Sequence, residues 1–251
     1  MGKKQWQGLT DDEKKRYSRQ IILDNFGQSG QEKLKNAVVF VAGAGGLASS
    51  ALPYLAASGI GTIRVCDYDA VELSNLNRQV VHSDRNIGIN KARSAKKRLR
   101  QVNPTIIIKT FECKIDETTV RRIVGNSNII VDCTDNLSTR LVLNAYAVQK
   151  KIPFVFGSVW GLKGYLSFFH VPETPCLECV FQKAPHEGEF PVLGTTPGVI
   201  GTFEALEVIK YFTGIGMNCK NKMLIFDGAL LLWKTVHIAR NPECPICSKL
   251  R

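Results

Sequence analysis

One glycine-rich segment constrains the fold more than any other part of the chain. Residues 40–49 read FVAGAGGLAS and lie between an apolar run and a stretch of small residues. Gly43, Gly45 and Ala48 fit the pattern G-x-G-x-x-G/A, in which the glycines allow a tight turn and close approach of a phosphate. Asp67 ends the next apolar run and can accept a hydrogen bond from a ribose hydroxyl. The segment therefore predicts a strand–turn–helix–strand unit that binds a nucleotide.

The hydrophobic pattern predicts the fold class. Short runs rich in Val, Ile and Phe alternate with amphipathic stretches at 90–103 and 139–151. The runs that we interpret as strands are residues 37–45, 62–69, 106–115, 128–136, 152–161, 164–171 and 222–228. This alternation predicts an α/β fold with a Rossmann-like, mostly parallel sheet and helices on both faces. The last two runs lack crossover helices of their own, which predicts an antiparallel C-terminal extension.

Neither an internal repeat nor a low-complexity linker interrupts the chain, which predicts a single domain over residues 1–251. Residues 1–30 form an N-terminal helical arm in this prediction. Thr10 can cap the first helix, and Glu13 stands three residues later, as in a capping box. Because the arm precedes the core sheet, we expect it to contact a second subunit.

Composition restricts the class of protein and its partners. Hydrophobic residues make up 44% of the chain and charged residues 22%, which is typical of a globular protein. The sequence has no apolar run long enough for a membrane span and no signal-peptide core, so we predict a cytoplasmic protein. The net charge of +11 favours acidic partners. Much of it lies in residues 90–101, which are either a solvated helix face or a docking patch.

Polar residues downstream of the glycine segment indicate which nucleotide is bound. Asn75, Arg78 and Gln79 share one loop, and Lys91 begins the next helical stretch. Asp135 lies just beyond the end of a predicted strand. Two cations and a carboxylate at one sheet edge suit a triphosphate with Mg²⁺ better than a nicotinamide ring.

Several motifs together carry a family resemblance. The segments RYSRQIIL, GAGGLA, DYDAVELSNLNRQ, NKA and DCTDN, with two CxxC pairs, resemble the MoeB/ThiF/HesA family over residues 16–247. The resemblance implies a ubiquitin-activating-type adenylyltransferase. In that family ATP reacts with the C-terminal glycine of a small ubiquitin-like sulfur carrier protein to give an acyl-adenylate and pyrophosphate.

The resemblance also implies residue roles. Gly43, Gly45 and Gly46 would line the nucleotide turn, and Asp67 would hold the ribose. Asn75, Arg78 and Lys91 would contact the phosphates, and Gln79 would join them in binding the nucleotide. Asp135 would bind Mg²⁺, with Asn136 beside it. Arg19 resembles an arginine that the family's N-terminal arm contributes to the triphosphate across a homodimer. A carboxylate is already ionised at neutral pH, so the reaction needs charge stabilisation rather than a general base.

Four of the eight cysteines form two CxxC pairs, Cys176/Cys179 and Cys244/Cys247. In an intracellular chain this spacing predicts a tetrahedral Cys₄ zinc site, although unligated thiols and a disulfide pair are the alternatives. Four thiolates leave no open coordination position, so the zinc would be structural and would clip the part of the chain at 176–247. Cys66 and Cys133 end apolar runs and are expected to be small buried hydrophobes.

Residues 183–201 form a Gly- and Pro-rich loop that can cross over a threaded peptide tail. Relatives that relay sulfur carry a cysteine in this region, whereas this chain has Thr195 and Thr196 at the approximate place. The hydroxyl of a threonine is a poor substitute for a thiolate, so the sequence favours chemistry that ends at the adenylate. His186 is interpreted as a surface residue.

The sequence does not identify the carrier protein, so molybdopterin synthesis, thiamine synthesis and tRNA thiolation all remain possible pathways. It also does not tell whether a separate sulfurtransferase supplies the sulfur.

Two other classes of function compete with adenylation. An NAD-dependent oxidoreductase would use the same glycine turn but leaves Arg78, Lys91 and the cysteine pairs unexplained. A non-catalytic zinc-stapled module would use the basic helix on nucleic acid.

Overall fold

The computed structural model describes residues 8–181 and 190–249. Its eight strands form one sheet in the order β3-β2-β1-β4-β5-β6-β7-β8. The strands are β1 (Val38–Ala42), β2 (Thr62–Cys66), β3 (Ile107–Phe111), β4 (Ile129–Asp132), β5 (Phe154–Trp160), β6 (Lys163–Phe169), β7 (Lys222–Asp227) and β8 (Leu232–His237). The first five pair in parallel, and β5 through β8 pair antiparallel. This confirms the predicted sheet and its antiparallel extension.

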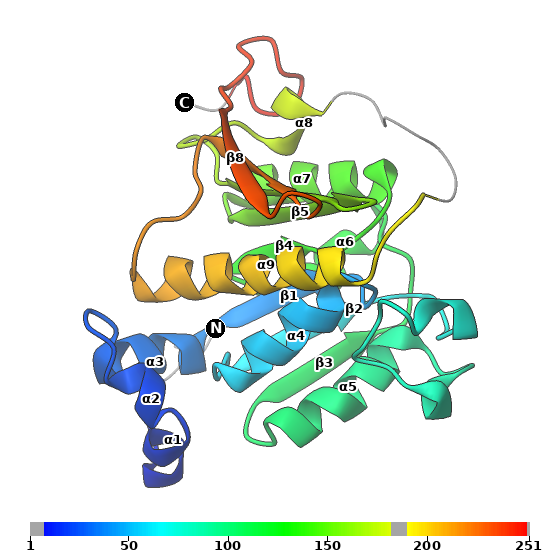
Figure 1. Ribbon diagram of the computed structural model, residues 1–251. Helices are drawn as coiled ribbons and strands as arrows, with labels where there is room; N and C mark the ends of the chain where they lie inside the picture. Colours follow the sequence, from blue (N-terminus) through cyan, green and yellow to red (C-terminus); the bar gives the residue numbers. More distant parts are fainter. Residues whose placement is uncertain (1–7, 182–189, 250–251) are drawn as a thin grey trace.

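Helices cover both faces of the sheet, as predicted. The α-helices are α1 (Asp11–Arg16), α2 (Ser18–Ile21), α3 (Gly27–Asn36), α4 (Ala48–Ala57), α5 (Lys91–Val102), α6 (Val120–Val124), α7 (Leu137–Lys150), α8 (Leu177–Val180) and α9 (Thr195–Thr213). Helices α4, α5 and α9 lie on one face and α6 and α7 on the other (Figure 1). Among the described residues, no helix combines the length and the apolar character needed to cross a membrane.

The central strand β1 is buried on both sides, which explains why its sequence is continuously apolar. All five of its residues are buried. Val39 and Val41 belong to the core under α4 and α9, whereas Phe40 and Ala42 belong to the core under α6 and α7. Alternate residues of a strand face opposite sides of a sheet, so a strand covered twice needs apolar residues at every position.

The strand order creates a switch point between β1 and β4. From β1 the chain moves outward through β2 and β3, and it then returns to add β4 and β5 on the other side. Ala42 pairs with Cys66 on one side and with Asp132 on the other. In open parallel sheets, ligands bind at the carboxyl ends of the strands where the order reverses. The glycine turn after β1 and the segment after β4 both begin at this point.

The edge strand β8 was not expected from the sequence. All six of its residues are exposed, so no face is buried and no alternation of apolar and polar residues marks it. It pairs with β7 from Lys222↔His237 to Asp227↔Leu232. Pairing with a neighbour, rather than a hydrophobic pattern, makes this segment a strand.

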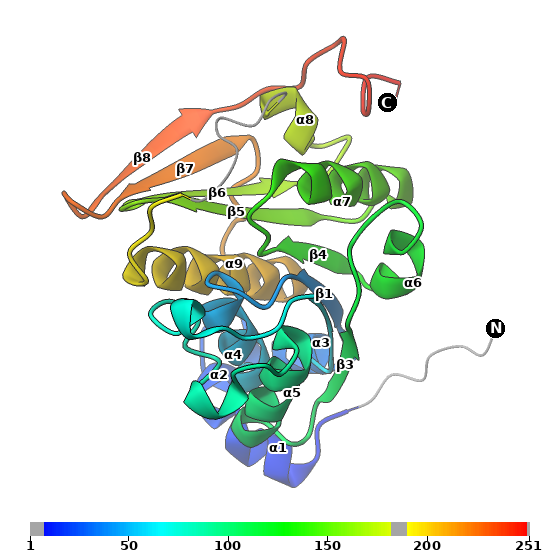
Figure 2. The ribbon, with the colours of Figure 1, turned by 90° about the vertical axis from the view of Figure 1, so that its right-hand side faces the viewer.

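The N-terminal arm begins with the predicted capping box, because the Thr10 hydroxyl accepts from the Glu13 N–H and the Glu13 carboxylate accepts from the Thr10 N–H. The arm packs on its own chain through Tyr17, whose hydroxyl accepts a hydrogen bond of 2.8 Å from Asn103 Nδ2. Helices α1 and α2 lie at the end of the molecule away from β8 (Figures 1 and 2). The arm's contact with a second subunit stays a prediction.

Candidate active site and cysteine cluster

The glycine turn is shaped by its contact with the neighbouring strand. Gly43 has φ +89°, and a Cβ at this position would lie 2.6 Å from the backbone oxygen of Cys133, just after β4. Only glycine tolerates both this left-handed conformation and the close approach. Gly45 faces Gln79 Nε2, which would lie 3.6 Å from an added Cβ, and Gly46 faces Pro197. The turn therefore contacts residues from β4, the 75–79 loop and α9.

Asp67 ties the glycine turn to the end of β2. Its Oδ2 accepts from the Ala44 N–H at 2.8 Å, and its Oδ1 accepts from the Asp69 N–H at 2.9 Å. Burial raises the pKa of Asp67, and these two hydrogen bonds and the charge of Lys91 act in the opposite direction. Each carboxylate oxygen can accept a further bond, so Asp67 can hold the turn and receive a ribose hydroxyl.

Lys91 is the first residue of α5 and is 8% exposed. Asn90 caps this helix by accepting from the Arg93 N–H. The Lys91 ammonium donates to Asp69 Oδ2 at 3.1 Å. This ion pair holds a cation beside the carboxyl end of β2, where a phosphate oxygen can replace or join the Asp69 carboxylate.

The loop after β2 offers further polar groups. It contains a short 3₁₀ helix, Leu73–Asn75, in which Asn75 is buried and its Oδ1 accepts from the Glu72 N–H. Arg78 donates from Nη1 to the Ser74 carbonyl at 2.8 Å. Gln79 is buried, and its Oε1 has no hydrogen-bond partner in the described part of the chain. Three of the predicted nucleotide contacts thus share one loop against the glycine turn.

The segment after β4 carries two neighbouring polar residues, Asp135 and Asn136, in different surroundings. Asp135 is exposed at the crevice edge. Asn136 is the N-cap of α7, and its Oδ1 accepts from the Thr139 N–H at 2.9 Å. Asn136 therefore shapes the start of α7, which leaves Asp135 as the carboxylate of this segment that faces solvent.

The raised pKa of Tyr68 indicates that several carboxylates lie near its phenol. The pKa of its phenol is raised, first by the negative charge of Asp69, then by burial, and further by Asp135 and Asp67. These carboxylates come from the ends of two strands, β2 and β4. Carboxylates gathered in this way favour a bound cation.

Two residues that support the crevice were missed in the sequence. Arg140, on α7, pairs with the fully buried Asp132 at 3.2 Å between Nε and Oδ2, and it also donates to the Gly157 carbonyl. His82 bridges the Ala44 carbonyl and the Ser94 hydroxyl through its two ring nitrogens, at 2.9 and 2.8 Å. Burial lowers the pKa of His82. The sequence signal that could have identified Arg140 is its position one turn into the helix that follows DCTDN. No sequence signal identified His82.

Arg19 does not join the other site residues within one chain. It lies in α2 and is exposed. The next residue, Gln20, donates from Nε2 to the Ser58 carbonyl at the end of α4, whereas the glycine turn precedes the start of α4. A ten-residue helix is about 15 Å long. Arg19 therefore lies about one helix length from the glycine turn of its own chain.

The four cysteines of the two CxxC pairs come together, and their sulfurs all lie within 4.8 Å of one another. The Sγ–Sγ distances are 3.6 Å for Cys176–Cys244, 3.4 Å for Cys179–Cys247 and 3.9 Å for Cys176–Cys179. Four sulfurs at tetrahedral Zn–S distance would be about 3.8 Å apart. Figures 1 and 2 show α8 and the C-terminal segment at the same end of the molecule.

The cluster's chemistry also fits a metal ion. Three of the four cysteines are buried. Burial raises the pKa of Cys176, so a thiolate there without a cation would be unfavourable. A divalent cation reverses this preference and holds the thiolates together. The donor set and its spacing therefore fit a resident metal.

The predicted loop over residues 183–201 is wrong in its last part, because α9 begins at Thr195 and residues 195–201 are helical. Thr196 is buried, and its hydroxyl donates to the Gly161 carbonyl at 3.0 Å. Thr195 is exposed. The part of the loop that contains His186 lies outside the described residues.

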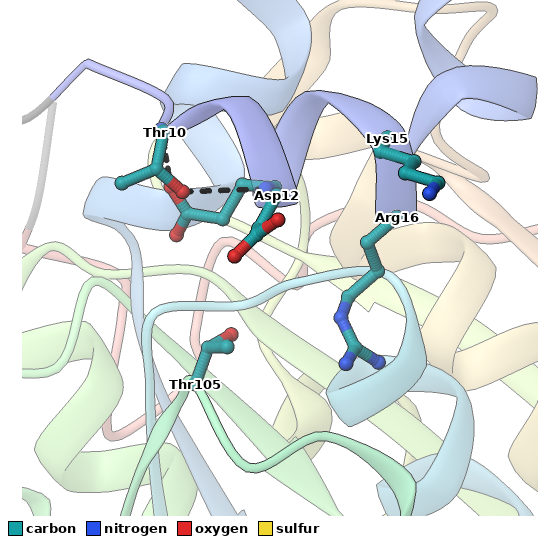
Figure 3. A pocket seen from close by; sticks show the side chains of 6 residues that line it. Thr10, Asp12, Lys15, Arg16 and Thr105 are labelled. Carbon is teal, nitrogen blue, oxygen red and sulfur yellow. Dashed lines mark hydrogen bonds between the residues drawn. The ribbon is translucent and has the colours of Figure 1, made fainter.

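A separate pocket of about 590 Å³ lies beside α1. It is lined by Thr10, Asp12, Glu13, Lys15, Arg16 and Thr105. Figure 3 shows Thr105 facing α1 across this space, with Lys15 and Arg16 further along the helix. Thr105 precedes β3, so the pocket is at the amino ends of the strands and its charges are mixed. The carboxyl ends of β1, β2 and β4, where the strand order reverses, are the better place for a nucleotide, because open parallel sheets bind ligands there.

A family model now identifies this arrangement. The model of the ThiF family matches residues 17–246. This chain belongs to the ThiF family. The predicted resemblance is confirmed, and neither the oxidoreductase nor the nucleic-acid alternative gains support from any of these findings.

Several members of this family resemble the chain over most of its length. The SAMP-activating enzyme E1 of Haloferax volcanii is 39% identical over 240 residues, which cover 93% of this chain and 88% of that protein. The sulfur carrier protein adenylyltransferase of Thermus thermophilus is 37% identical over 249 residues, 95% of this chain and 92% of that protein. An adenylyltransferase and sulfurtransferase MOCS3 of Drosophila persimilis is 38% identical, and the chain spans only 55% of its length.

Solved structures agree with the fold. The crystal structure of E. coli MccB with ATP has a TM-score of 0.84 to this chain at 26% identity, and the match covers 92% of this chain and 73% of that one. The ThiF family member described here therefore shares its architecture with a protein crystallised together with ATP.

Proposed function

We propose that this chain is an ATP-dependent adenylyltransferase that activates the C-terminal glycine carboxylate of a small ubiquitin-like sulfur carrier protein. The product is an acyl-adenylate, and pyrophosphate is released. One observation carries the proposal: in a ThiF family chain, the glycine turn, Lys91 and the segment of Asp135 meet at the carboxyl ends of β1, β2 and β4. Relatives of nearly the same length, named for sulfur carrier adenylation or SAMP activation, support it.

The residues suit attack by a carboxylate on the α-phosphorus of ATP. A new P–O bond forms to the carrier, and the bond to the pyrophosphate oxygen breaks. Both the attacked phosphate and the leaving pyrophosphate are anionic, so positive charge must be in place before the reaction. Arg78 and Lys91 can supply it, while Asp67 orients the ribose. The incoming carboxylate is ionised at neutral pH, so the site needs no proton acceptor.

Mg²⁺ belongs to this proposal. Asp135 is exposed and, like Asp67 and Asp69, its charge raises the pKa of Tyr68. Carboxylate oxygens are the ligands that Mg²⁺ prefers. The ion would neutralise charge on the triphosphate when bound. The supporting residues are Asn136, which caps α7, and Arg140, which clamps Asp132; both fix the segment that carries Asp135.

We also propose a homodimer in which Arg19 reaches the partner's nucleotide. The separation of Arg19 from its own glycine turn supports this arrangement. Mixing two inactive variants, Arg19→Ala and Asp135→Asn, tests it. Each mixed dimer would contain one intact site, so roughly a quarter of the wild-type rate should return on mixing. Failure of the mixture to regain activity, with mixed dimers demonstrated by a tag on one variant, would refute the shared site.

The four-cysteine cluster is proposed to bind zinc as a structural ion, joining α8 to the C-terminal segment. We further propose that this chain's chemistry ends at the adenylate and that a separate sulfurtransferase supplies sulfur. The absence of cysteine from residues 183–201 supports this limit. A carrier incubated with ATP and this chain alone should acquire AMP but no sulfur.

The central reaction is tested by exchange of labelled pyrophosphate into ATP. The assay uses candidate carriers in two forms, intact and without the last glycine. We expect exchange only with an intact carrier, because its terminal carboxylate must reach the α-phosphorus. Exchange that ignores the missing glycine would refute the substrate, and absence of exchange with every ubiquitin-like carrier of the source organism would refute the reaction.

A further inference from the structure

Two cysteines outside the zinc cluster face each other at the ends of β2 and β3. Cys66 Sγ and Cys113 Sγ are 4.0 Å apart. Cys66 pairs in the parallel register with Phe111, the last residue of β3, and Cys113 follows two residues after the end of this strand. Both side chains belong to the hydrophobic cluster on the α6 side. The pairing of the strands thus sets the two thiols opposite each other, although 47 positions separate them in the sequence.

The two thiols differ in access and in charge. Cys66 is fully buried, and Cys113 is partly exposed. Arg122, on α6, donates from Nη2 to Cys113 Sγ at 3.5 Å, which puts a positive charge beside the more accessible sulfur. Such a charge favours attack by the sulfur on an oxidant. Cys133 and Cys219 are both buried, and no cysteine pairs with either among the described residues.

We propose that Cys66 and Cys113 form a reversible disulfide on exposure to hydrogen peroxide, and that this disulfide weakens nucleotide binding. The Cys113 thiolate attacks hydrogen peroxide, the O–O bond breaks, and Cys113 becomes a sulfenic acid, while the leaving hydroxide takes up the proton that the thiol lost and becomes water. The Cys66 thiol then attacks the Cys113 sulfur, the S–O bond breaks, and a second water leaves. Two thiols lose two electrons in total, and the peroxide is reduced to water.

Coupling to the nucleotide crevice follows from the position of Cys66. It directly precedes Asp67, whose N–H donates to the Phe111 carbonyl at 3.1 Å and whose carboxylate holds the glycine turn. A disulfide requires the sulfurs to approach to about 2.05 Å. The sulfurs must therefore move about 2 Å closer together. Any part of this movement that the end of β2 takes up is passed on to Asp67, and a binding constellation tolerates displacements of only about 0.5 Å. This second step rests on the proposed function, whereas formation of the disulfide does not.

The test uses the full-length, zinc-loaded protein and limiting hydrogen peroxide, followed by alkylation of remaining thiols and peptide mass mapping. A coloured chelator reports zinc release in parallel. We expect a Cys66–Cys113 linked peptide before zinc is released, and its loss on reduction with dithiothreitol. The conservative variant Cys113→Ser should form no linked peptide, and the control Cys219→Ala should behave as wild type. Oxidation of the zinc cysteines without the linked peptide would overturn the disulfide.

Nucleotide binding is measured separately, with a fluorescent ATP analogue and no carrier. Oxidation should weaken binding about tenfold, the loss expected for one hydrogen bond to a charged group. Binding should recover on reduction, and Cys113→Ser should be insensitive to peroxide. A linked peptide with unchanged nucleotide affinity would overturn the coupling. If the reduced protein bound no ATP, the proposed function would fail, while the linked peptide would still decide the modification.

Discussion

The proposed nucleotide site and the cysteine cluster arrange their polar side chains in opposite ways. In the cluster, four sulfurs from two short segments face one another and form a closed set. In the proposed nucleotide site, the polar groups come from the ends of β1, β2 and β4 and from the 75–79 loop, and Asp135 faces solvent. A closed donor set suits a resident ion that stabilises the fold, whereas an open one suits a substrate that enters and leaves. We therefore expect substitutions in the cluster to lower stability and substitutions in the proposed nucleotide site to lower activity.

The largest effect is expected at the open site. Asp135→Asn removes the exposed carboxylate proposed to hold Mg²⁺, and its exposure means that the fold should be little affected. We expect the exchange rate to fall about 10²- to 10³-fold, as for other preorganised charge-stabilising groups. Pyrophosphate exchange measures this, with Glu117→Gln, an exposed carboxylate before α6, as the matched control. A comparable loss of exchange in the control, or a large drop in the melting temperature of Asp135→Asn, would contradict a specific role of Asp135 in the reaction.

The closed site should behave in the opposite manner. Cys244→Ser removes one of the four sulfurs and leaves the others without a complete donor set. We expect the free energy of unfolding to fall by more than about 3 kcal/mol, which exceeds most single substitutions. Chemical denaturation and zinc quantification measure the effect. The control Cys219→Ala removes a buried thiol outside the cluster and should cost about 1 kcal/mol; an equal loss in both variants would argue against a structural metal.

Glu204, on α9, is a buried carboxyl that lies against Gly157 and Cys133. It is fully buried, its Oε1 has no hydrogen-bond partner among the described residues, and it occupies the space left by Gly157. Burial raises its pKa far above the usual range, and the charge of Asp132 adds to this. Because the folded-state pKa is above the unfolded value, this carboxyl contributes stability that is present at acidic pH and is lost as pH rises.

Glu204→Gln should therefore flatten the dependence of stability on pH. The wild type is expected to lose up to about 1.4 kcal/mol per pH unit relative to the variant, starting above the ordinary pKa of glutamate. Denaturation midpoints from pH 4 to 9, about the range in which a buried carboxyl titrates, measure the difference. Parallel pH profiles for the two proteins would show that the Glu204 carboxyl does not retain its proton in the fold.

The smallest effect is expected in the arm that carries Arg19. Thr10→Ala removes one half of the capping box and should lower helix stability by about 1 kcal/mol. If Arg19 completes the partner's site, this loosening should lower exchange activity several-fold without changing zinc content. Thr118→Ala, at an exposed turn distant from the arm, is the control. Activity that is unaffected by Thr10→Ala while Arg19→Ala abolishes it would show that the arm is held by contacts other than this cap.

Much of the fold and part of the site were predictable from local sequence. The order strand, glycine turn, helix, strand is a pattern of adjacent residues, and the CxxC pairs have a spacing that is typical of metal sites. Arg140, His82 and the Cys66–Cys113 pair were not predictable in this way, because each acts across elements that meet only when the sheet forms. Strand β8 was missed for a related reason: it is defined by pairing with β7, and it buries no face. The single-domain boundaries and the cytoplasmic location stay predictions.

The intact mass of the carrier after incubation with ATP, Mg²⁺ and this protein tests the central claim most directly. The account predicts that an intact carrier gains the mass of AMP on its terminal glycine, and that neither a carrier without that glycine nor the Asp135→Asn variant gives this adduct. Hydroxylamine should release the AMP from the carrier, as expected of an acyl-phosphate anhydride. ATP turnover with no adduct on any carrier, even with product release blocked by rapid quenching, would contradict the account.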